Sequence, residues 1–455
     1  MSMMGKTWAR LGGPYRASTQ RSCVRCTSDG ECDVRGQDLV CDAETALCVH
    51  KPLLPLAATD LTGTLGVVLG AALAAGAGLG GGGLFVPLFV LVMGFAPSEA
   101  IPLSKATIFG SALANFVVAA RRRHPAASRP LIDYAVVLML EPMTLAGSIL
   151  GVLLNTVLPS WLILGLLIVL LTATTLRTYA KAKAIAARET AVSKRDSVLS
   201  DEANASGASE VAGLSPELAA IRAAEARIPM GKVASVGAVW LAVLVLSMIK
   251  GGHGARSVVG IEPCSAGYWL VLAAALPGAW LVTVWIGGCL RREHAAKEAA
   301  GYTFLPSDIR WTAHTTKVIP RYSFGAGVAA GLMGIGGGMI KGPLLLELGM
   351  EPSASTATSG FMIMFTSSAT VAQFVVLGQL ALPYAAWFAG WGFVAALCGQ
   401  YLLRAAVART GTQSLIAFLV AGVIGLSTAL LTYTGAVSVV KELASGASMG
   451  FSTPC

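Results

Sequence analysis

The chain is dominated by long apolar segments that are separated by short polar or basic connections. Segments of this length can cross a hydrocarbon core about 30 Å thick as α-helices. They include Tyr134–Leu158, Trp161–Leu176, Ala266–Leu290, Ala381–Leu403 and Leu415–Val437. The pattern predicts an all-α polytopic membrane protein with about 8–12 membrane segments, because helices satisfy their own backbone hydrogen bonds in lipid.

Composition narrows the class further. The chain is 55% hydrophobic and only 13% charged, with a mean hydropathy of +0.69, which is too apolar for a soluble globular protein. The lipid bilayer is therefore one expected partner. The formal net charge of +9 comes from arginines and lysines gathered in the connections. These charges report on membrane topology, and we expect no nucleic-acid partner.

Two glycine-rich stretches interrupt otherwise helical apolar sequence. The first runs from Gly78 to Pro87 and the second from Gly334 to Pro343, and in both the proline follows the first glycine by nine residues. Glycine disfavours a helix interior by up to about 1 kcal/mol per residue, so each cluster predicts a broken helical hairpin. Two broken helices at matching positions are the sequence feature that best indicates a transporter's binding site.

The stretches belong to two matching halves of the chain. Ala96-Pro97-Ser98 matches Glu351-Pro352-Ser353, and the run that begins at Asn115 matches the run that begins at Gln373. The predicted divisions are a cysteine-rich segment 1–60, a first transmembrane repeat 61–180, a polar linker 181–232, an inserted pair of spans 233–290, a loop 291–317, a second repeat 318–434 and a tail 435–455. We expect the polar linker to be flexible.

Basic connections predict the orientation of the halves. Arginine and lysine concentrate in Arg121–Arg129, in the linker, in Arg291–Lys317 and in Arg404–Arg409, which should therefore be cytosolic. The turns at Pro97, Pro159 and Leu380 lack these residues and should face the other side. The halves then start on opposite sides of the membrane, so they are predicted to be inverted repeats with both chain ends non-cytosolic.

The first sixty residues differ from the rest. Five cysteines crowd together here, with little apolar sequence around them, which is typical of a small disulfide-linked unit in an oxidising compartment. Because five is odd, one must pair elsewhere or stay free. A zinc site that uses Cys23, Cys26 and His50 is the less favoured alternative. The disulfide candidates are Cys23, Cys26, Cys32, Cys41 and Cys48.

The glycine breaks are the candidate substrate site. A broken helix offers unpaired backbone N–H groups and a positive dipole end, which together can hold an anion without a charged side chain. The alternative is that the glycines only permit close helix packing or a kink. The matched copies favour the site, which is assigned to Gly80, Gly81, Gly82, Gly83, Gly336, Gly337 and Gly338.

Several polar side chains beside the breaks are candidate ligands. A lysine at membrane depth is a functional hypothesis by default, although Lys105 could instead snorkel and Lys341 could pair with Glu347. Hydroxyl and amide groups at related positions of the two halves could donate to the substrate or simply join helices. The substrate-binding candidates of this kind are Ser104, Lys105, Thr107, Asn115, Lys341, Thr358, Ser359 and Gln373.

Glu141 is the one acidic residue deep in a long apolar span, directly before Pro142. Desolvation raises the pKa of a carboxyl group in such a place, which suits it to relay a proton in coupled transport. The alternative is a carboxyl group that caps the backbone at the proline kink. Glu141 is thus the candidate proton relay.

The paired glycine–proline hairpins, with the Pro-Ser that follows each, resemble the TauE/SafE sulfite exporter family, also called the four-TMS sulfite uptake permease family. The likeness covers about Leu61–Tyr433, and the cysteine-rich start together with the segment Gly260–Trp269 resembles the eukaryotic branch. The resemblance implies transport of sulfur-containing anions such as sulfite or sulfonates, with possible proton coupling. Family members differ in substrate, so it does not define one.

Together these features predict a membrane permease for small anions in the plasma membrane or an endomembrane. We expect no catalytic residues, cofactor or metal, because no nucleophile–base pair or histidine cluster lies within the spans. The sequence leaves open whether the protein forms a homo-oligomer. The alternatives are an anion channel that uses the glycine stretches as a filter, and a receptor that uses the extracellular cysteine-rich segment.

Overall fold

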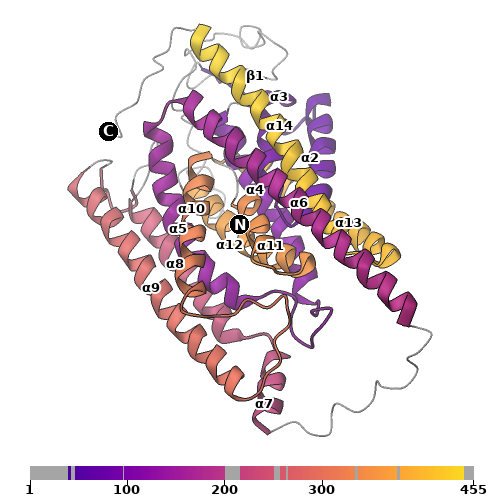
Figure 1. The fold of residues 1–455 in the computed structure, drawn as a ribbon. Helices are drawn as coiled ribbons and strands as arrows, with labels where there is room; N and C mark the ends of the chain where they lie inside the picture. Colours follow the sequence, from indigo (N-terminus) through magenta and orange to yellow (C-terminus); the bar gives the residue numbers. More distant parts are fainter. Residues whose placement is uncertain are drawn as a thin grey trace, which may run out of the picture.

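The structure is a computed structural model that describes residues 39–42, 47–95, 97–199, 216–250, 257–262, 265–333, 337–376 and 380–444. This part of the chain forms a short β-hairpin and thirteen α-helices (Figure 1). The first half contains β1 Leu39–Asp42, β2 Leu47–His50, α2 Ala58–Ala77, α3 Gly82–Leu91, α4 Pro97–Ala120, α5 Tyr134–Val157 and α6 Ser160–Leu199. The middle contains α7 Pro216–Glu225, α8 Met230–Lys250 and α9 Ala266–Ala299. The second half contains α10 Thr315–Met333, α11 Gly338–Glu347, α12 Pro352–Val376, α13 Leu382–Thr410 and α14 Ser414–Ala444.

Among the described residues, nine helices are long and apolar enough to cross a membrane. The protein is therefore an integral multi-pass membrane protein, and the predicted all-α class with 8–12 segments is confirmed. The short helices α3 and α11 have ten residues each. At 1.5 Å per residue each is about 15 Å long, half of what a full crossing needs.

The order of elements repeats in the two halves. A long helix, a ten-residue helix and three long helices occur as α2–α6 and again as α10–α14. The inserted helices α8 and α9 stand along one side of the bundle (Figure 1). The glycine stretches thus fall at the same place in each half, between the first helix and the short one.

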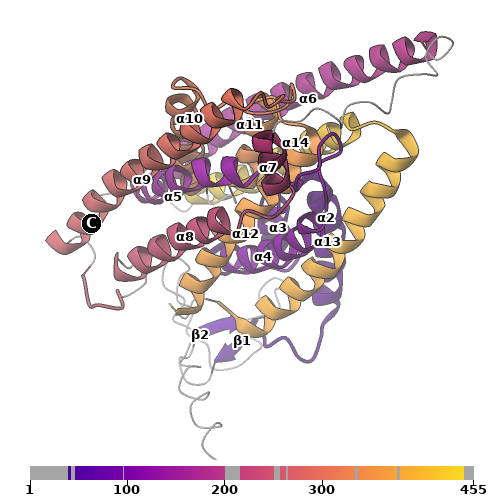
Figure 2. The same ribbon diagram turned by 90° about the horizontal axis from the view of Figure 1, so that it is seen from below.

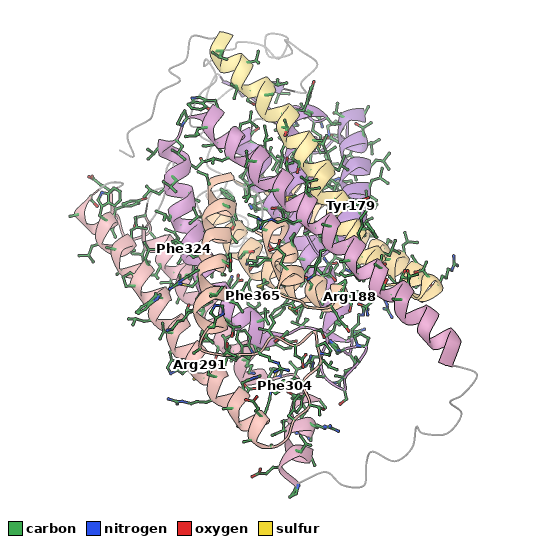
Figure 3. The ribbon with its side chains drawn as sticks, viewed as in Figure 1. Tyr179, Arg188, Arg291, Phe304, Phe324 and Phe365 are labelled. Atoms are coloured by element: carbon green, nitrogen blue, oxygen red, sulfur yellow. The ribbon has the colours of Figure 1, made fainter. Side chains whose placement is uncertain are left out.

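Helix α6 extends into the segment that was predicted to be a flexible linker, so the linker prediction was wrong for residues 181–199. The helix continues past Tyr179 and Arg188, both labelled in Figure 3, and reaches far beyond the bundle in Figure 2. The physical reason lies in the run Ala180–Thr190, which is rich in alanine, lysine and arginine. These residues are strong helix formers, so the polar composition does not end the helix.

Two pairs of long helices run parallel across the boundary between the halves. The hydrogen bonds that join helices α2 and α13 include Tyr384 to Asp60, Trp387 to Thr64 and Gln400 to the carbonyl of Ala75. Helices α5 and α10 pack closely through glycines that both helices contribute. Gly147 and Gly151 of α5 face the carbonyl groups of Phe324 and Val328. Gly327 and Gly331 of α10 face the carbonyl groups of Thr144 and Ser148. In each pair, contacting residues follow each other in the same order along both helices, so the two helices are parallel. Each pair joins the first helix of one half to the fourth helix of the other half, so the two pairs are equivalent.

The last helices of the two halves run antiparallel to each other. Tyr179 of α6 packs on Phe418 of α14 with ring centroids 5.8 Å apart, whereas Leu164 lies against Gly435. These two helices lie side by side as the long diagonal helices of Figure 1. Counterparts that run in opposite directions are what an inverted repeat generates, and parallel repeats would make them parallel. The inversion of the two halves stays a prediction.

The N-terminal hairpin lies against the non-cytosolic ends predicted for α2 and α13. Its register places Cys41 opposite Cys48, while Cys23, Cys26 and Cys32 lie outside the described residues. His50 stacks on Phe95 at 3.9 Å. The His50 ring nitrogen Nε2 also lies 3.3 Å from the carbonyl oxygen of Met93. This packing gives His50 a structural role in the hairpin's attachment to the bundle.

Candidate functional site

The first glycine break is a left-handed turn between α2 and α3. Gly78, which follows the last residue of α2, has φ of 66°, and Gly80 and Gly81 have φ of 70° and 77°. Residues with a Cβ rarely adopt these angles, so three glycines are required for the chain to leave one helix and enter the next. Helix α3 then begins at Gly82, and Gly82 and Gly83 are buried.

The second break has a different backbone path. Gly337 precedes α11 with φ of −52°, an ordinary helical value, and Gly336 lies outside the described residues. A Cβ added to Gly337 would lie 3.4 Å from Cε of Lys341, which is acceptable contact. A Cβ added to Gly338 would overlap Ile363 and lie 2.8 Å from the carbonyl oxygen of Leu79. The second break therefore needs glycine for close approach at position 338.

The two breaks meet in the middle of the bundle. Gly338, the first residue of α11, faces the backbone of Leu79 in the first break. Gly83 in turn faces Met339 of α11 and Ser427 of α14, with no space for a side chain. The N-termini of both short helices thus lie next to each other, which places their unpaired N–H groups and positive dipole ends together.

Hydroxyl groups of α12 hold the breaks in place. Ser359 Oγ donates to the carbonyl of Gly78 at 3.0 Å, and Ser355 Oγ donates to the carbonyl of Gly342 at 3.1 Å. Thr358 Oγ1 instead accepts from the backbone N–H of Asp133, at the start of α5. Of the predicted ligands on α12, Ser359 is therefore at the breaks, and Thr358 secures the loop before α5.

A buried ion pair lies beside the second break. Lys341 Nζ of α11 donates to Glu141 Oε2 of α5 at 2.8 Å, and the two side chains are 0% and 1% exposed. The alternative pairing of Lys341 with Glu347 was wrong, because Glu347 lies 3.9 Å from Arg177 on the surface. The one acid and one of the two lysines singled out from the sequence are thus joined, although they come from different halves of the chain.

Four buried polar atoms near the breaks have no hydrogen-bond partner within the described part of the chain. Buried polar groups are normally satisfied, so each such atom needs an explanation. Glu141 Oε1 is the second oxygen of the carboxylate whose Oε2 accepts from Lys341, and Ser427 lies against Gly83. Ser104 lies on α4 one helical turn before Ile108, and the Ile108 side chain packs against Gly80. The four atoms are Ser104 Oγ, Asn115 Nδ2, Glu141 Oε1 and Ser427 Oγ.

The remaining predicted ligands are dispersed. Lys105 is half-buried on α4, and no ion pair is recorded for it among the described residues. Thr107 Oγ1 is bonded within its own helix, to the carbonyl of Leu103. Asn115 Oδ1 accepts from Gln400 of α13 at 3.2 Å. Gln373, the sequence counterpart of Asn115, is half-buried near the end of α12 and is not brought to Asn115.

Gln400 and Ser427 are members of the site that the sequence interpretation missed. Gln400 is the amide that links Asn115 to the last turn of α2, through the carbonyl of Ala75 at 2.7 Å. The available signal was a lone glutamine in the otherwise apolar span Ala381–Leu403. Ser427 carried no comparable signal, because single serines are common in membrane helices as helix contacts.

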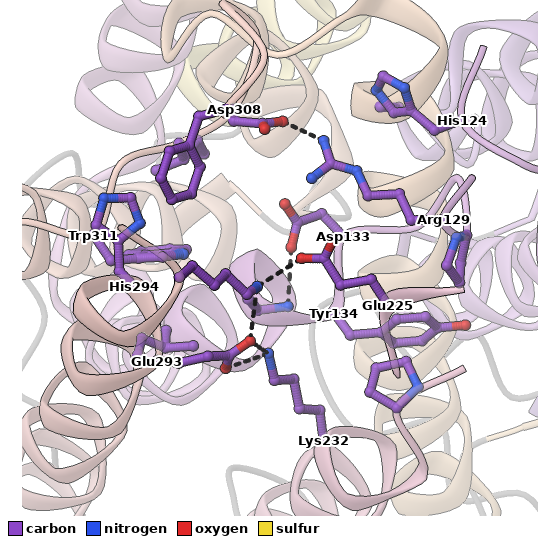
Figure 4. Close-up of a pocket in the computed structure, with 18 of the residues that line it drawn as sticks. His124, Arg129, Asp133, Tyr134, Glu225, Lys232, Glu293, His294, Asp308 and Trp311 are labelled. Atoms are coloured by element: carbon purple, nitrogen blue, oxygen red, sulfur yellow. Dashed lines mark hydrogen bonds and ion pairs between the residues drawn. The ribbon is translucent and has the colours of Figure 1, made fainter. Parts of the chain in front are cut away.

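Away from the glycine breaks, a cavity of about 400 Å³ lies between the loop before α5, helices α7–α9 and the loop before α10 (Figure 4). Three of its cations are matched with carboxylates: Arg129 bonds Asp308, Lys232 lies 2.7 Å from Glu293, and Lys297 lies 2.7 Å from Glu225. These interactions tie the predicted cytosolic loops to the inserted pair of helices. The cavity therefore has a well-compensated charge lining.

Burial sets the protonation of the groups in this cavity. Burial lowers the pKa of His124, and the nearby Glu351 carboxylate, 3.5 Å away, only partly opposes this effect. His124 is therefore neutral at pH 7. Burial, reinforced by a hydrogen bond to Glu225, raises the pKa of Tyr302 to about 12. Tyr302 thus stays protonated and donates to Glu225.

A multi-pass helical bundle in which two matched broken helices meet beside a buried ion pair has the architecture of a secondary transporter. The family model "Sulfite exporter TauE/SafE" matches residues 63–287 and 228–430. The chain belongs to the TauE/SafE family of membrane transporters, and the resemblance stated from its motifs is confirmed.

Curated relatives agree with this assignment. The chain is 31% identical over 408 residues to "Sulfite exporter TauE/SafE family protein 3" of Arabidopsis thaliana, with 86% of this chain and 82% of the relative covered. It is also 31% identical over 414 residues to family protein 2 of the same plant, with 89% and 90% covered. No solved structure gives a significant match.

Proposed function

We propose that the protein carries a small sulfur-containing oxyanion, sulfite or an organosulfonate, together with a proton across its membrane. One observation carries the proposal: the meeting glycine breaks lie beside a fully buried Glu141–Lys341 pair, and one oxygen of its carboxylate has no partner within the described part of the chain. An ionisable pair at membrane depth is functional by default. The substrate class follows the names of the Arabidopsis relatives, which are called sulfite exporter family proteins.

The anion binds at the adjacent N-termini of α3 and α11. The first residues of these helices, Gly82 and Gly338, have backbone N–H groups without intrahelical partners. The absence of side chains there lets an oxyanion approach the backbone closely. Ser427 and Ser104 supply hydroxyl groups that lack a partner among the described residues.

Proton coupling arises from competition for Lys341. In the structure its ammonium group is neutralised by Glu141 at 2.8 Å. Protonation of Glu141 removes that negative charge and leaves Lys341 as an unpaired cation beside Gly337. An arriving anion then restores neutrality in a region where an isolated charge is strongly disfavoured. One proton and one singly charged anion thus cross together.

Alternating access uses the two halves as inverted repeats. The antiparallel packing of α6 on α14 and the matched pairs α2–α13 and α5–α10 support this arrangement. Rocking of one half against the other would expose the shared site between the breaks to each side in turn. The N-terminal hairpin lies on the non-cytosolic side in this arrangement.

The test is uptake of radiolabelled sulfite, with a sulfonate and sulfate alongside, in proteoliposomes with and without an inward proton gradient. The proposal predicts saturable uptake of sulfite or the sulfonate that the gradient accelerates. Protein-free liposomes are the control. Uptake that does not saturate and ignores the proton gradient would favour the channel, and absence of flux for all three anions would overturn the substrate class.

A further inference from the structure

A second cavity, of about 300 Å³, lies where the C-terminal half of α13 meets the turn after α4 and the start of α12. Among the described residues its charged lining consists of Arg122, Arg123 and Arg404, with no acidic side chain. Thr356 and Gln400 contribute hydroxyl and amide groups. The cavity therefore has the lining of an anion site, since guanidinium groups bind oxyanions through paired N–H donors.

The arginines of this basic cavity lack the compensation seen in the larger cavity. No carboxylate partner is recorded for Arg122 or Arg404 among the residues that the structure describes, whereas Arg129 nearby bonds Asp308. Burial and then the like charge of Arg404 lower the pKa of Arg122. Glu189 approaches the same region, but its carboxylate accepts from the N–H groups that begin α14. Two neighbouring cations thus repel each other across a space that an anion would fill.

The basic cavity leads to the first glycine break. Gly76, in the last turn of α2, lines it, and the backbone of Thr356 packs directly against Gly78. Gln400, which lines the cavity, donates to Asn115, whose own Nδ2 is buried without a partner in the described structure. A polar path of amides therefore connects the arginines with the break.

We propose that the basic cavity is a docking site for small oxyanions on the cytosolic side, from which the anion passes Gln400 and Asn115 to the glycine breaks. The proposal rests on the proposed function for the identity of the anion. Arg122 and Arg123 lie in the connection after α4 and Arg404 lies in the C-terminal half of α13, and both regions are predicted to be cytosolic from their basic residues. Unscreened positive charge at a channel-like entrance raises the local anion concentration and the rate of capture, and added salt weakens both effects.

The test compares sulfite flux from each face, in inside-out and right-side-out vesicles, for the wild type and the Arg122→Gln/Arg404→Gln variant. We expect the KM for anion presented at the cytosolic face to rise about tenfold, because a charge-assisted hydrogen-bonding pair is lost. The maximal rate and the KM at the other face should stay unchanged. Arg121→Gln/Arg409→Gln is the matched control, since these exposed arginines lie outside the lining and carry the same charge.

A binding readout separates this proposal from transport itself. Sulfite and sulfate should raise the melting temperature of the detergent-solubilised wild type and of the control variant more than that of the Arg122→Gln/Arg404→Gln variant, which keeps only the site at the glycine breaks. That pattern supports the docking site even if neither anion is transported. In that case the proposed transport function fails and the docking site does not. Equal stabilisation of all three proteins, or equal changes in KM for both double variants, would overturn the docking site.

Discussion

Replacing Lys341 with methionine is expected to abolish coupled anion flux and to lower the free energy of unfolding by about 3–5 kcal/mol. The substitution keeps the volume of the side chain but leaves Glu141, only 1% exposed, as an uncompensated buried charge. The loss can be measured by SDS-dependent unfolding, followed by tryptophan fluorescence, alongside sulfite uptake in proteoliposomes.

Two further variants separate the fold from the transport function. Glu347→Gln is the matched control, because Glu347 lies six residues from Lys341, is partly exposed and only approaches Arg177. It should change stability by less than about 1 kcal/mol. The double variant Lys341→Met/Glu141→Gln should recover most of the lost stability, since no unpaired charge remains, and yet transport nothing. Recovery of flux in this double variant would contradict a role for the pair in transport.

Replacing Gly338 with alanine is the second large effect that we expect. The added methyl group would overlap Ile363 and press on the carbonyl oxygen of Leu79, which belongs to the other break. Because backbone cannot move aside as a flexible side chain can, the two breaks must separate. We expect a loss of about 1–3 kcal/mol in stability and of most of the sulfite flux.

Gly337→Ala provides the comparison at the adjacent position. Its added methyl group would lie 3.4 Å from Cε of Lys341, 3.8 Å from Cβ of Ala330 and 4.0 Å from Cδ of Lys341, which is ordinary contact, and the backbone angle suits alanine. The variant should keep the wild-type maximal rate and stability. Equal loss of flux in both variants would show that any side chain in this stretch blocks the anion, whereas equal retention would make the contact between the breaks dispensable.

Much of the architecture follows from local sequence features. Long apolar runs predict the spans, and glycine clusters in otherwise helical sequence predict the two breaks, because both signals arise from neighbouring residues. Helix α6 is the instructive exception. Its polar second part suggested a flexible linker, but alanine, lysine and arginine keep the helix intact as far as Leu199.

The candidate site was only partly predictable. Glu141 stood out as a lone acid in an apolar span, but its partner lies 200 residues away in the chain and is set by how the halves pack. Proximity in sequence favoured Glu347 instead. The basic cavity has the same origin, since Arg122 and Arg404 come together only when α13 packs beside α4. Contacts between distant helices leave no periodic signal in one sequence.

The most direct test of the central proposal is sulfite transport by Glu141→Gln, which mimics the protonated carboxyl group. The variant should retain exchange of labelled sulfite between the two sides, because Lys341 is free to meet the anion at the breaks. It should lose the acceleration of net uptake by an inward proton gradient that the wild type shows. Acceleration of Glu141→Gln by the gradient to the same degree as the wild type would contradict proton coupling through the Glu141–Lys341 pair.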